Sequence, residues 1–253
     1  MHIKHLAVAA TAALLPLVVA GSAEANHAWG GYHWARTSNP FTVQLGDNVS
    51  SAWDGSLAGA STDWSKSTVL DTTVVAGSTK PRTCKATSGM VQVCNATYGN
   101  TGWLGVASIS VTGGTHITQG TVKLNDTYFN TAQYNTPAWR ALVTCQEVGH
   151  TFGLDHQDEV FDNPNLGTCM DYTNDPSTNQ HPNQHDYDEL VTIYSHLDST
   201  TTVGASTPSN HPQVGNDEAS WGHRVEGSRS AGHATYVRDF GDGESVVTFV
   251  TWA

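Results

Sequence analysis

The sequence predicts an α/β (α+β) protein in which a twisted mixed sheet packs against helices. Three observations near the start of the chain predict this class. Residues 40–45 alternate apolar and polar side chains, which is the period of a half-buried strand. Residues 49–65 repeat apolar side chains at the spacing of one helix face, and residues 69–75 again have the composition of a strand. A strand, a helix and a strand in this order are typical of a sheet with one helix packed behind it.

The rest of the chain adds elements of both kinds. Four further segments have the pattern expected of strands, and the last two flank a Gly-Asp-Gly turn that predicts a hairpin: 103–111, 117–124, 234–240 and 244–252. Thr136 followed by Pro137 predicts the N-cap and first position of a long helix. A later helix is expected over 187–196. Segment 77–102 is rich in turn residues and is expected to form a loop or a hairpin, and His116 is expected to be a solvated loop histidine.

Composition narrows the class of partner. The chain has 253 residues and a net charge of −12, with 11 Lys and Arg against 23 Asp and Glu. Binding to nucleic acid or to an anionic membrane surface would require a basic footprint, so neither partner is expected. An apolar run over 6–20, followed by Ala-Glu-Ala at 23–25, is typical of a secretory signal peptide. We therefore expect residues 1–25 to be removed and the protein to be a secreted, extracellular monomer.

The stretch from residue 146 to residue 156 concentrates the side chains that carry chemistry. Gln146 and His150 are four residues apart and project from one face of a helix, with Glu147 about 100° round the axis. Gly153 can adopt the left-handed conformation that ends a helix, and the resulting turn would bring His156 back to the same face. Three metal ligands and one carboxylate would then meet at one point, as in a catalytic zinc site.

These residues resemble the signature of the metzincin zinc metalloproteases (matrixins, astacins and serralysins), H-E-x-x-H-x-x-G-x-x-H followed by a Met-turn. Four residues match the signature: Glu147, His150, Gly153 and His156. The sequence Thr-Cys-Met-Asp-Tyr at 168–172 resembles the Met-turn. The resemblance implies a twisted sheet, an active-site helix, the Met-turn and a closing C-terminal helix.

The resemblance also implies an activity, that of a zinc-dependent metalloendopeptidase acting on a protein or peptide. The metal ligands that it implies for one Zn²⁺ are Gln146, His150 and His156. Glu147 would be the general base that takes a proton from the attacking water. Tyr172 would contact the metal or the oxyanion, and Met170 would form an apolar floor, with Gly153 making the turn. By the same resemblance, strand 117–124 would lie near the cleft and pair with an extended substrate.

Gln146 departs from the family pattern, because the family has its first zinc-binding histidine at this position. The amide oxygen reaches about as far as an imidazole nitrogen but is a weaker donor for zinc. Three outcomes stay open. Gln146 binds zinc directly, or it binds a water or the surrounding hydrogen-bond network while a remote residue such as His181 or His185 completes the site, or the site holds no metal. The last outcome would make the chain a catalytically inactive secreted binding or structural protein that keeps the protease fold.

Four cysteines in an exported chain predict two disulfides, and their spacing alone leaves three pairings open. In the family the Met-turn lies beneath the metal, so the resemblance implies that Cys145 pairs with Cys169. With that bond, Cys84 pairs with Cys94.

The chain is expected to divide into four parts. These are the signal peptide 1–25, a metzincin-like catalytic domain 26–200, a Ser/Thr/Pro-rich linker 201–216 and a C-terminal β-rich extension 217–253. The acidic loop after His156 lacks EF-hand spacing, so a calcium ion is conceivable there but has no support.

Overall fold

The computed structural model describes residues 27–206 and 213–253, so the expected signal peptide lies outside the described residues. The fold is mixed α/β, with a single twisted nine-stranded sheet in the described part of the chain. The strands are β1 (His33–Trp34), β2 (Phe41–Asn48), β3 (Leu70–Ala76), β4 (Met90–Ala96), β5 (Trp103–Thr112), β6 (His116–Asn125), β7 (His223–Ser228), β8 (His233–Gly241) and β9 (Glu244–Trp252). The helices are α1 (Asp54–Trp64), α2 (Asp126–Phe129), α3 (Pro137–His150), α4 (Gln184–Ile193) and α5 (Glu218–Trp221), with a short 3₁₀ turn η1 (Arg229–Ala231).

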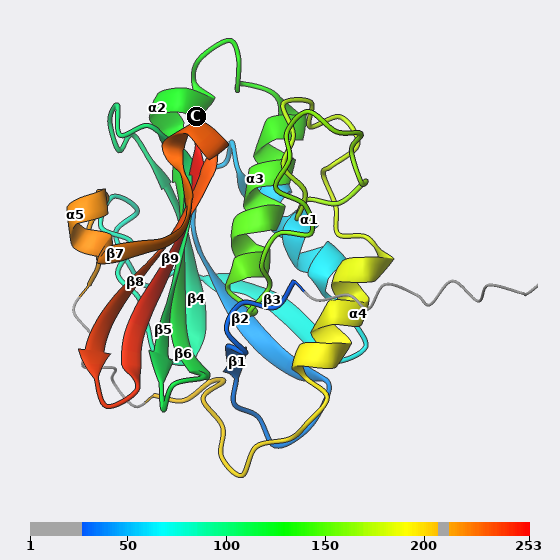
Figure 1. Ribbon diagram of the computed structural model, residues 1–253, viewed down its shortest axis with the longest axis vertical. Helices are drawn as coiled ribbons and strands as arrows, with labels where there is room; N and C mark the ends of the chain where they lie inside the picture. Colours follow the sequence, from blue (N-terminus) through cyan, green and yellow to red (C-terminus); the bar gives the residue numbers. More distant parts are fainter. Residues whose placement is uncertain (1–26, 207–212) are drawn as a thin grey trace, which may run out of the picture.

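The sheet has a parallel half and an antiparallel half. Its strand order is β3-β2-β4-β6-β5-β9-β8-β7, and β1 pairs with the start of β6. The pairs β2/β3, β2/β4 and β4/β6 are parallel, whereas every pair from β6 through β5 to β7 is antiparallel. Helices α1, α3 and α4 lie on one face of this sheet (Figure 1). The mixed sheet with helices that the sequence predicted is confirmed.

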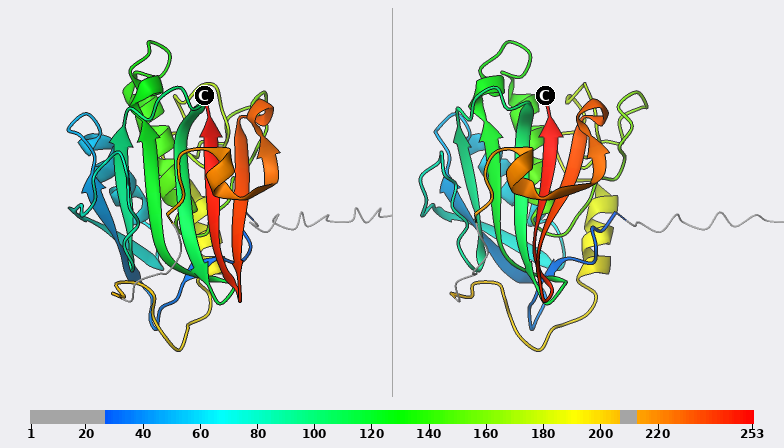
Figure 2. Two further views of the ribbon diagram at one scale, coloured as in Figure 1. Left: turned by 90° about the vertical axis from the view of Figure 1, so that its left-hand side faces the viewer. Right: turned by 60° about the vertical axis from the view of Figure 1, so that its left-hand side comes forward.

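The C-terminal strands continue the same sheet. Strand β9 runs antiparallel to β5 along nearly its whole length, from Trp103 opposite Trp252 to Val111 opposite Ser245. Figure 2 shows β8 and β9 beside the central strands. The hairpin predicted from 234–240 and 244–252 is confirmed. Its place in the sheet was not predicted, because no local pattern specifies which edge a hairpin joins.

One expectation about the sheet is wrong. Segment 117–124 was expected to lie near the cleft and receive a substrate strand, but β6 pairs with β4 on one side and with β5 on the other. In the strand order β6 lies between β4 and β5, so it has no free edge for a substrate strand. The outer edge of β5 is in turn filled by β9.

Helix α3 begins and ends as its sequence predicts. The side chain of Thr136 accepts a hydrogen bond from the backbone N–H of Trp139, and Pro137 occupies the first turn. After His150 the chain turns at Gly153, whose φ is +92°. A Cβ at this glycine would lie 2.0 Å from the carbonyl oxygen of Tyr32, so both the backbone angle and the space require glycine.

The other two long helices differ from expectation at their starts. Helix α1 was expected from residue 49, but it begins at Asp54, and its N-cap Trp53 makes no side-chain capping bond. Asn48, at the end of β2, hydrogen-bonds Gln92 on the neighbouring strand β4. Helix α4 begins at Gln184, where Asn183 and Asp186 form a capping box. On α1, Leu57 and Trp64 are buried, whereas Val191 on α4 is exposed.

Strand β4 lies inside the segment that was expected to form a loop or a hairpin. Val91 and Val93 of this strand are buried, and the disulfide Cys84–Cys94 ties the preceding loop to it. The second disulfide joins Cys145 to Cys169, so both implied pairings are confirmed.

The segment expected to be a linker contacts the main sheet where it is described. The backbone N–H of Gly204 donates to the carbonyl of Gly89, and Lys123 on β6 donates to Asn216. The boundaries at 200 and 217 stay a prediction. Among the described residues, no helix is both long enough and apolar enough to span a membrane.

Candidate metal centre

The last turn of α3 and the turn after it bring two histidines together. Gln146, Glu147 and His150 are all buried on α3, and His156 returns to them after Gly153. The imidazole rings of His150 and His156 meet edge to face with 4.5 Å between their centroids. These two side chains therefore converge, as their spacing in the sequence predicts.

His150 is held in a form suited to binding a metal. Its Nδ1 lies 2.9 Å from the carbonyl oxygen of Leu154 and, in the tautomer protonated at Nδ1, donates a hydrogen bond to it. Its Nε2 is buried without a hydrogen-bond partner. Burial, followed by the charge of His156, lowers the pKa of His150 to about 3. A neutral imidazole with one nitrogen fixed by a carbonyl and the other unpartnered is the usual state of a zinc ligand.

His156 contacts the tyrosine of the predicted Met-turn. Its Nε2 lies 2.7 Å from the hydroxyl of Tyr172, and its Nδ1 lies 3.3 Å from a carboxylate oxygen of Asp155. Burial and then the charge of His233 lower the pKa of His156 well below its usual value. Burial and then the charge of Glu147 raise the pKa of Tyr172 well above its usual value, so the phenol keeps its proton. Tyr172 can therefore donate to His156 or to another acceptor in its place.

Both ends of the Gln146 amide are engaged. Its Nε2 donates to the carbonyl oxygen of Cys169 at 3.0 Å, and its Oε1 accepts from the hydroxyl of Thr251 at 2.8 Å. The remote histidines considered as substitute ligands are engaged elsewhere. His181 lies 2.6 Å from a carboxylate oxygen of Asp63 on α1, and His185 stacks on His27.

Glu147 is fully buried between α3 and the sheet. A Cβ added at Gly105 on β5 would lie 2.4 Å from Oε1 of Glu147, so the carboxyl fits only because that position is a glycine. The same oxygen lies 2.7 Å from the hydroxyl of Thr251, and Oε2 is buried without a partner. Burial raises the pKa of Glu147 to about 8, although hydrogen bonds from Thr251 and from the backbone of Ala107 lower it in part. Glu147 is therefore mostly protonated at neutral pH.

The predicted Met-turn packs against α3. Met170 is fully buried, and its sulfur lies 2.8 Å from where a Cβ on Gly149 would stand. Its side chain therefore covers the helix turn that carries His150. This contact requires a residue without a side chain at 149, which the sequence alone did not reveal.

The C-terminal strands contribute residues that sequence reasoning missed. Phe249 on β9 stacks on His150 with 4.4 Å between centroids and 3° between planes. His233 on β8 stacks on Tyr172 at 4.5 Å, and its Nε2 lies 3.3 Å from a carboxylate oxygen of Glu159. Burial lowers the pKa of His233, but the hydrogen bond and charge of Glu159 outweigh it and the pKa is raised. These residues are about 80 to 100 positions from the signature, so no local motif could have identified them.

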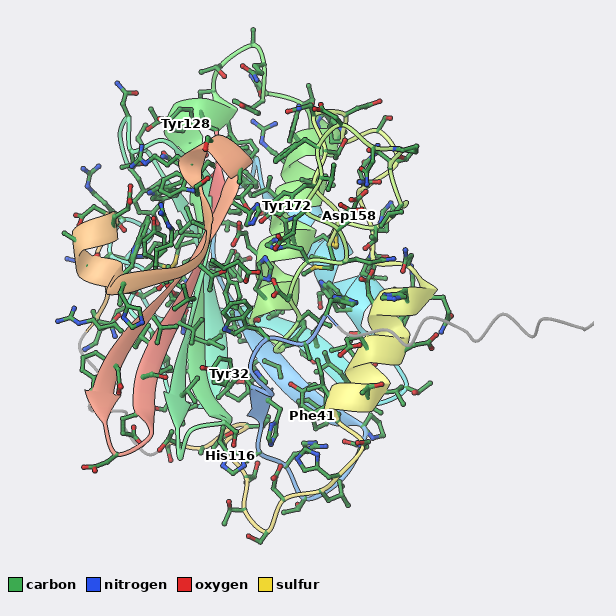
Figure 3. All side chains as sticks on the ribbon, in the orientation of Figure 1. Tyr32, Phe41, His116, Tyr128, Asp158 and Tyr172 are labelled. Carbon is green, nitrogen blue, oxygen red and sulfur yellow. A yellow bond between two sulfur atoms is a disulfide. The ribbon has the colours of Figure 1, made fainter. Side chains whose placement is uncertain are left out.

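A cavity of about 290 Å³ opens onto one side of this centre. Gln146 and Tyr172 line it, together with apolar side chains from α3 and the end of β9, including Trp139 and Trp252. Arg229 on η1 adds one cation to the wall. Figure 3 labels Tyr172 beside α3, at the interface with the sheet. A side chain entering this cavity would reach the part of the centre that Gln146 and Tyr172 form.

Two of the three expected ligands offer a nitrogen for zinc, and the third offers an oxygen. His150 offers a buried, unpartnered nitrogen, and the ring of His156 lies next to it. The third expected ligand, Gln146, offers an oxygen that already accepts a hydrogen bond from Thr251. A zinc ion at this oxygen would therefore compete with the hydroxyl of Thr251.

Comparisons with known proteins add little to this geometry. No protein-family model matches the sequence, and no curated protein matches it. Among solved structures, the chain is similar to high choriolytic enzyme 1, a hatching enzyme zinc-protease from the medaka fish Oryzias latipes. The TM-score is 0.34 and the identity 12%, over 64% of this chain and 94% of that chain. Values this low carry no argument for activity, which must come from the residues themselves.

Proposed function

We propose that the protein is a secreted, zinc-dependent metalloendopeptidase of the metzincin type. The observation that carries the proposal is the buried Nε2 of His150, which has no hydrogen-bond partner and belongs to a ring that meets the ring of His156 edge to face. A buried imidazole nitrogen without a partner is costly unless something binds it. The signature residues around it and the Met-turn at 168–172 support the same function.

The chain supplies groups for both proton transfer and charge stabilisation. A bound zinc ion would act as a Lewis acid and lower the pKa of its water. In its carboxylate form, Glu147 would take a proton from the attacking water and later pass it to the leaving amine, and its raised pKa of about 8 favours holding that proton between the two steps. Tyr172 keeps its proton and can donate it in a hydrogen bond to the oxyanion.

The cavity beside Gln146 and Tyr172 supports a substrate with an apolar side chain. Its walls include Leu104, Leu142 and Trp252, which favour an aliphatic or aromatic group. A peptide cannot extend the sheet at β5, because β9 already pairs with that edge. Substrate binding therefore relies on the cavity, or requires β9 to leave β5.

One observation favours a second candidate, a secreted binding or structural protein that cleaves nothing. The hydroxyl of Thr251 contacts both Gln146 and Glu147, so the C-terminal strand hydrogen-bonds to the two residues that would bind metal and move protons. A protein without catalytic activity would tolerate this arrangement permanently.

Metal analysis and a cleavage assay distinguish the two functions. We expect the purified protein to contain zinc and to cleave casein or gelatin, with a chelator abolishing cleavage and added zinc restoring it. Glu147→Ala should keep the metal and lose cleavage, which separates the general base from the ligands. If the protein binds no zinc near His150 and cleaves neither substrate, the result favours the second candidate, a binding or structural protein.

A further inference from the structure

A second group of metal-binding side chains lies away from the centre on α3. It combines His33 on β1, His116 at the start of β6, and His196 and Asp198 in the segment that follows α4. Figure 3 labels His116 near the lower end of the sheet and Tyr172 well above it, beside α3. The group joins three segments that are distant in sequence, and His116, which was expected in a loop, is the first residue of β6.

The potential ligand atoms lie close together. Nε2 of His33 lies 3.1 Å from Nε2 of His196 and 3.6 Å from Oδ1 of Asp198. The same oxygen lies 3.3 Å from Nε2 of His116 and 3.8 Å from Nε2 of His196. Three of the four distances exceed a normal hydrogen bond of about 2.7–3.2 Å. Taken together, the four distances run from 3.1 to 3.8 Å. This range includes the separation of about 3.3–3.5 Å expected between two ligands of a tetrahedral zinc ion with bonds of about 2.0–2.1 Å.

The groups behind these atoms hold them in position and leave them available. Nδ1 of His33 lies 2.8 Å from the carbonyl oxygen of Gly31, so the tautomer that donates this bond has an unprotonated Nε2. Oδ2 of Asp198 accepts hydrogen bonds from the backbone N–H of Arg36 at 3.1 Å and from its guanidinium at 2.9 Å. Both partners occupy the far side of the ligand, as the outer partners of metal ligands usually do.

Burial and exposure are also suited to an ion. The side chains of His33 and Asp198 are 7% and 11% exposed, whereas those of His116 and His196 are 33% and 51% exposed. His33 and Asp198 are therefore fixed inside the fold, and His196 faces the solvent from which an ion would arrive.

We propose that His33, His196 and Asp198 form a second divalent-metal site that takes Zn²⁺, with water at the fourth position. Two imidazoles and one carboxylate form a donor set that suits zinc. The ion would tie β1 to the segment after α4. This second site is independent of the function proposed for the centre at His150.

Metal content and thermal stability of the full-length protein test this site. The protein is stripped with a chelator, loaded with Zn²⁺ and separated from free metal, and zinc is counted per chain. We expect His196→Ala and Asp198→Asn each to hold one zinc fewer than the wild type, with an affinity at this site at least about 100-fold weaker. Zinc should also raise the Tm of the wild type by more than that of either variant. Co²⁺ loading gives a direct readout, because the wild type should show the d–d absorption of Co²⁺ at this site and the variants should lose it.

The variants are chosen so that the result does not depend on folding or on catalysis. His196 is exposed, and asparagine at 198 can still accept from Arg36, so both proteins should fold. His223→Ala, an exposed histidine on β7, is the matched control and should keep the wild-type zinc count. Equal zinc counts and equal zinc-induced Tm shifts in the wild type, His196→Ala and Asp198→Asn would overturn the proposal. Because the readout is a difference of one zinc, it holds whether or not the centre at His150 binds metal.

Discussion

The hydroxyl of Thr251 on β9 lies 2.7 Å from Oε1 of Glu147 on α3. The same hydroxyl lies 2.8 Å from Oε1 of Gln146, and its single proton can serve only one of the two acceptors at a time. The hydroxyl of Thr251 therefore donates either to Glu147 or to Gln146. The C-terminal strand is thus part of the hydrogen-bond network of the candidate metal centre.

Replacing Thr251 with valine tests whether this network competes with metal. Without the hydroxyl, the amide oxygen of Gln146 gives up no hydrogen bond when it binds an ion. A hydrogen bond contributes about 1 kcal/mol, so zinc affinity should rise about fivefold, measured by competition with a chelator of known affinity. Thr248→Val on the same strand removes a hydroxyl bonded to Ser108 and should leave the affinity unchanged. An unchanged affinity in Thr251→Val would show that the Gln146 oxygen does not bind the metal.

Gln146→His tests the position that departs from the metzincin signature. Imidazole is a better donor for zinc than an amide oxygen, so we expect zinc affinity to rise at least about tenfold. The change also removes the bond from the amide to the carbonyl of Cys169 and the acceptor for Thr251, which should lower the Tm in the metal-free state. Gln146→Ala is the matched control and should weaken zinc binding. If alanine and histidine give the same affinity as glutamine, the residue at 146 is not a ligand.

The sequence was most informative where a single element determines the outcome. Helix α3 is specified by Thr136, Pro137 and Gly153, each through a bond or a backbone angle that needs only neighbouring residues. Strand β4 was missed because its seven residues lie between turn-rich segments and its burial comes from pairing with β2 and β6. Strand β7, with the sequence His-Arg-Val-Glu-Gly-Ser, has no apolar alternation and is defined by its pairing with β8.

The candidate site was half predictable for the same reason. The i, i+4 spacing and the turn at Gly153 bring His150 and His156 together without help from the rest of the fold. The burial of Glu147 depends on Gly105 and on β9, and these contacts follow from the order of strands in the sheet. Strand order is a property of the whole chain, which no motif around residue 147 could reveal.

The disulfide beside the centre should affect both stability and metal binding. Cys145 and Cys169 are 24 residues apart, so replacing both with alanine should cost about 3–4 kcal/mol in the free energy of unfolding. It should also weaken zinc binding, because Gln146 follows one cysteine and donates to the carbonyl of the other. The matched control removes the disulfide Cys84–Cys94, which spans 10 residues and should cost about 3 kcal/mol. Urea unfolding and zinc competition measure the two effects, and an equal loss of zinc affinity in both variants would contradict the local role.

Lys123 on β6 should give the protein a pH-dependent stability at alkaline pH. Its ammonium is buried and donates to the carbonyl of Gly215 and the side chain of Asn216, and burial lowers its pKa to about 8 from 10.5. Between these two pH values the unfolded chain binds a proton that the folded chain has lost. Stability from this group therefore rises as the pH increases from about 8 to 10.5, and below pH 8 the burial of the charge is fully unfavourable.

Lys123→Met removes the titrating group and keeps a side chain of similar length. The difference in Tm between this variant and the wild type should be largest below pH 8, in favour of methionine, and should shrink by pH 10.5. Thermal unfolding at several pH values from 7 to 10.5 measures it, with the exposed Lys66→Met as a control for the change in net charge. A constant difference across this range would mean that the ammonium of Lys123 titrates alike in the folded and unfolded chain. The contacts with Gly215 and Asn216 would then compensate fully for its burial.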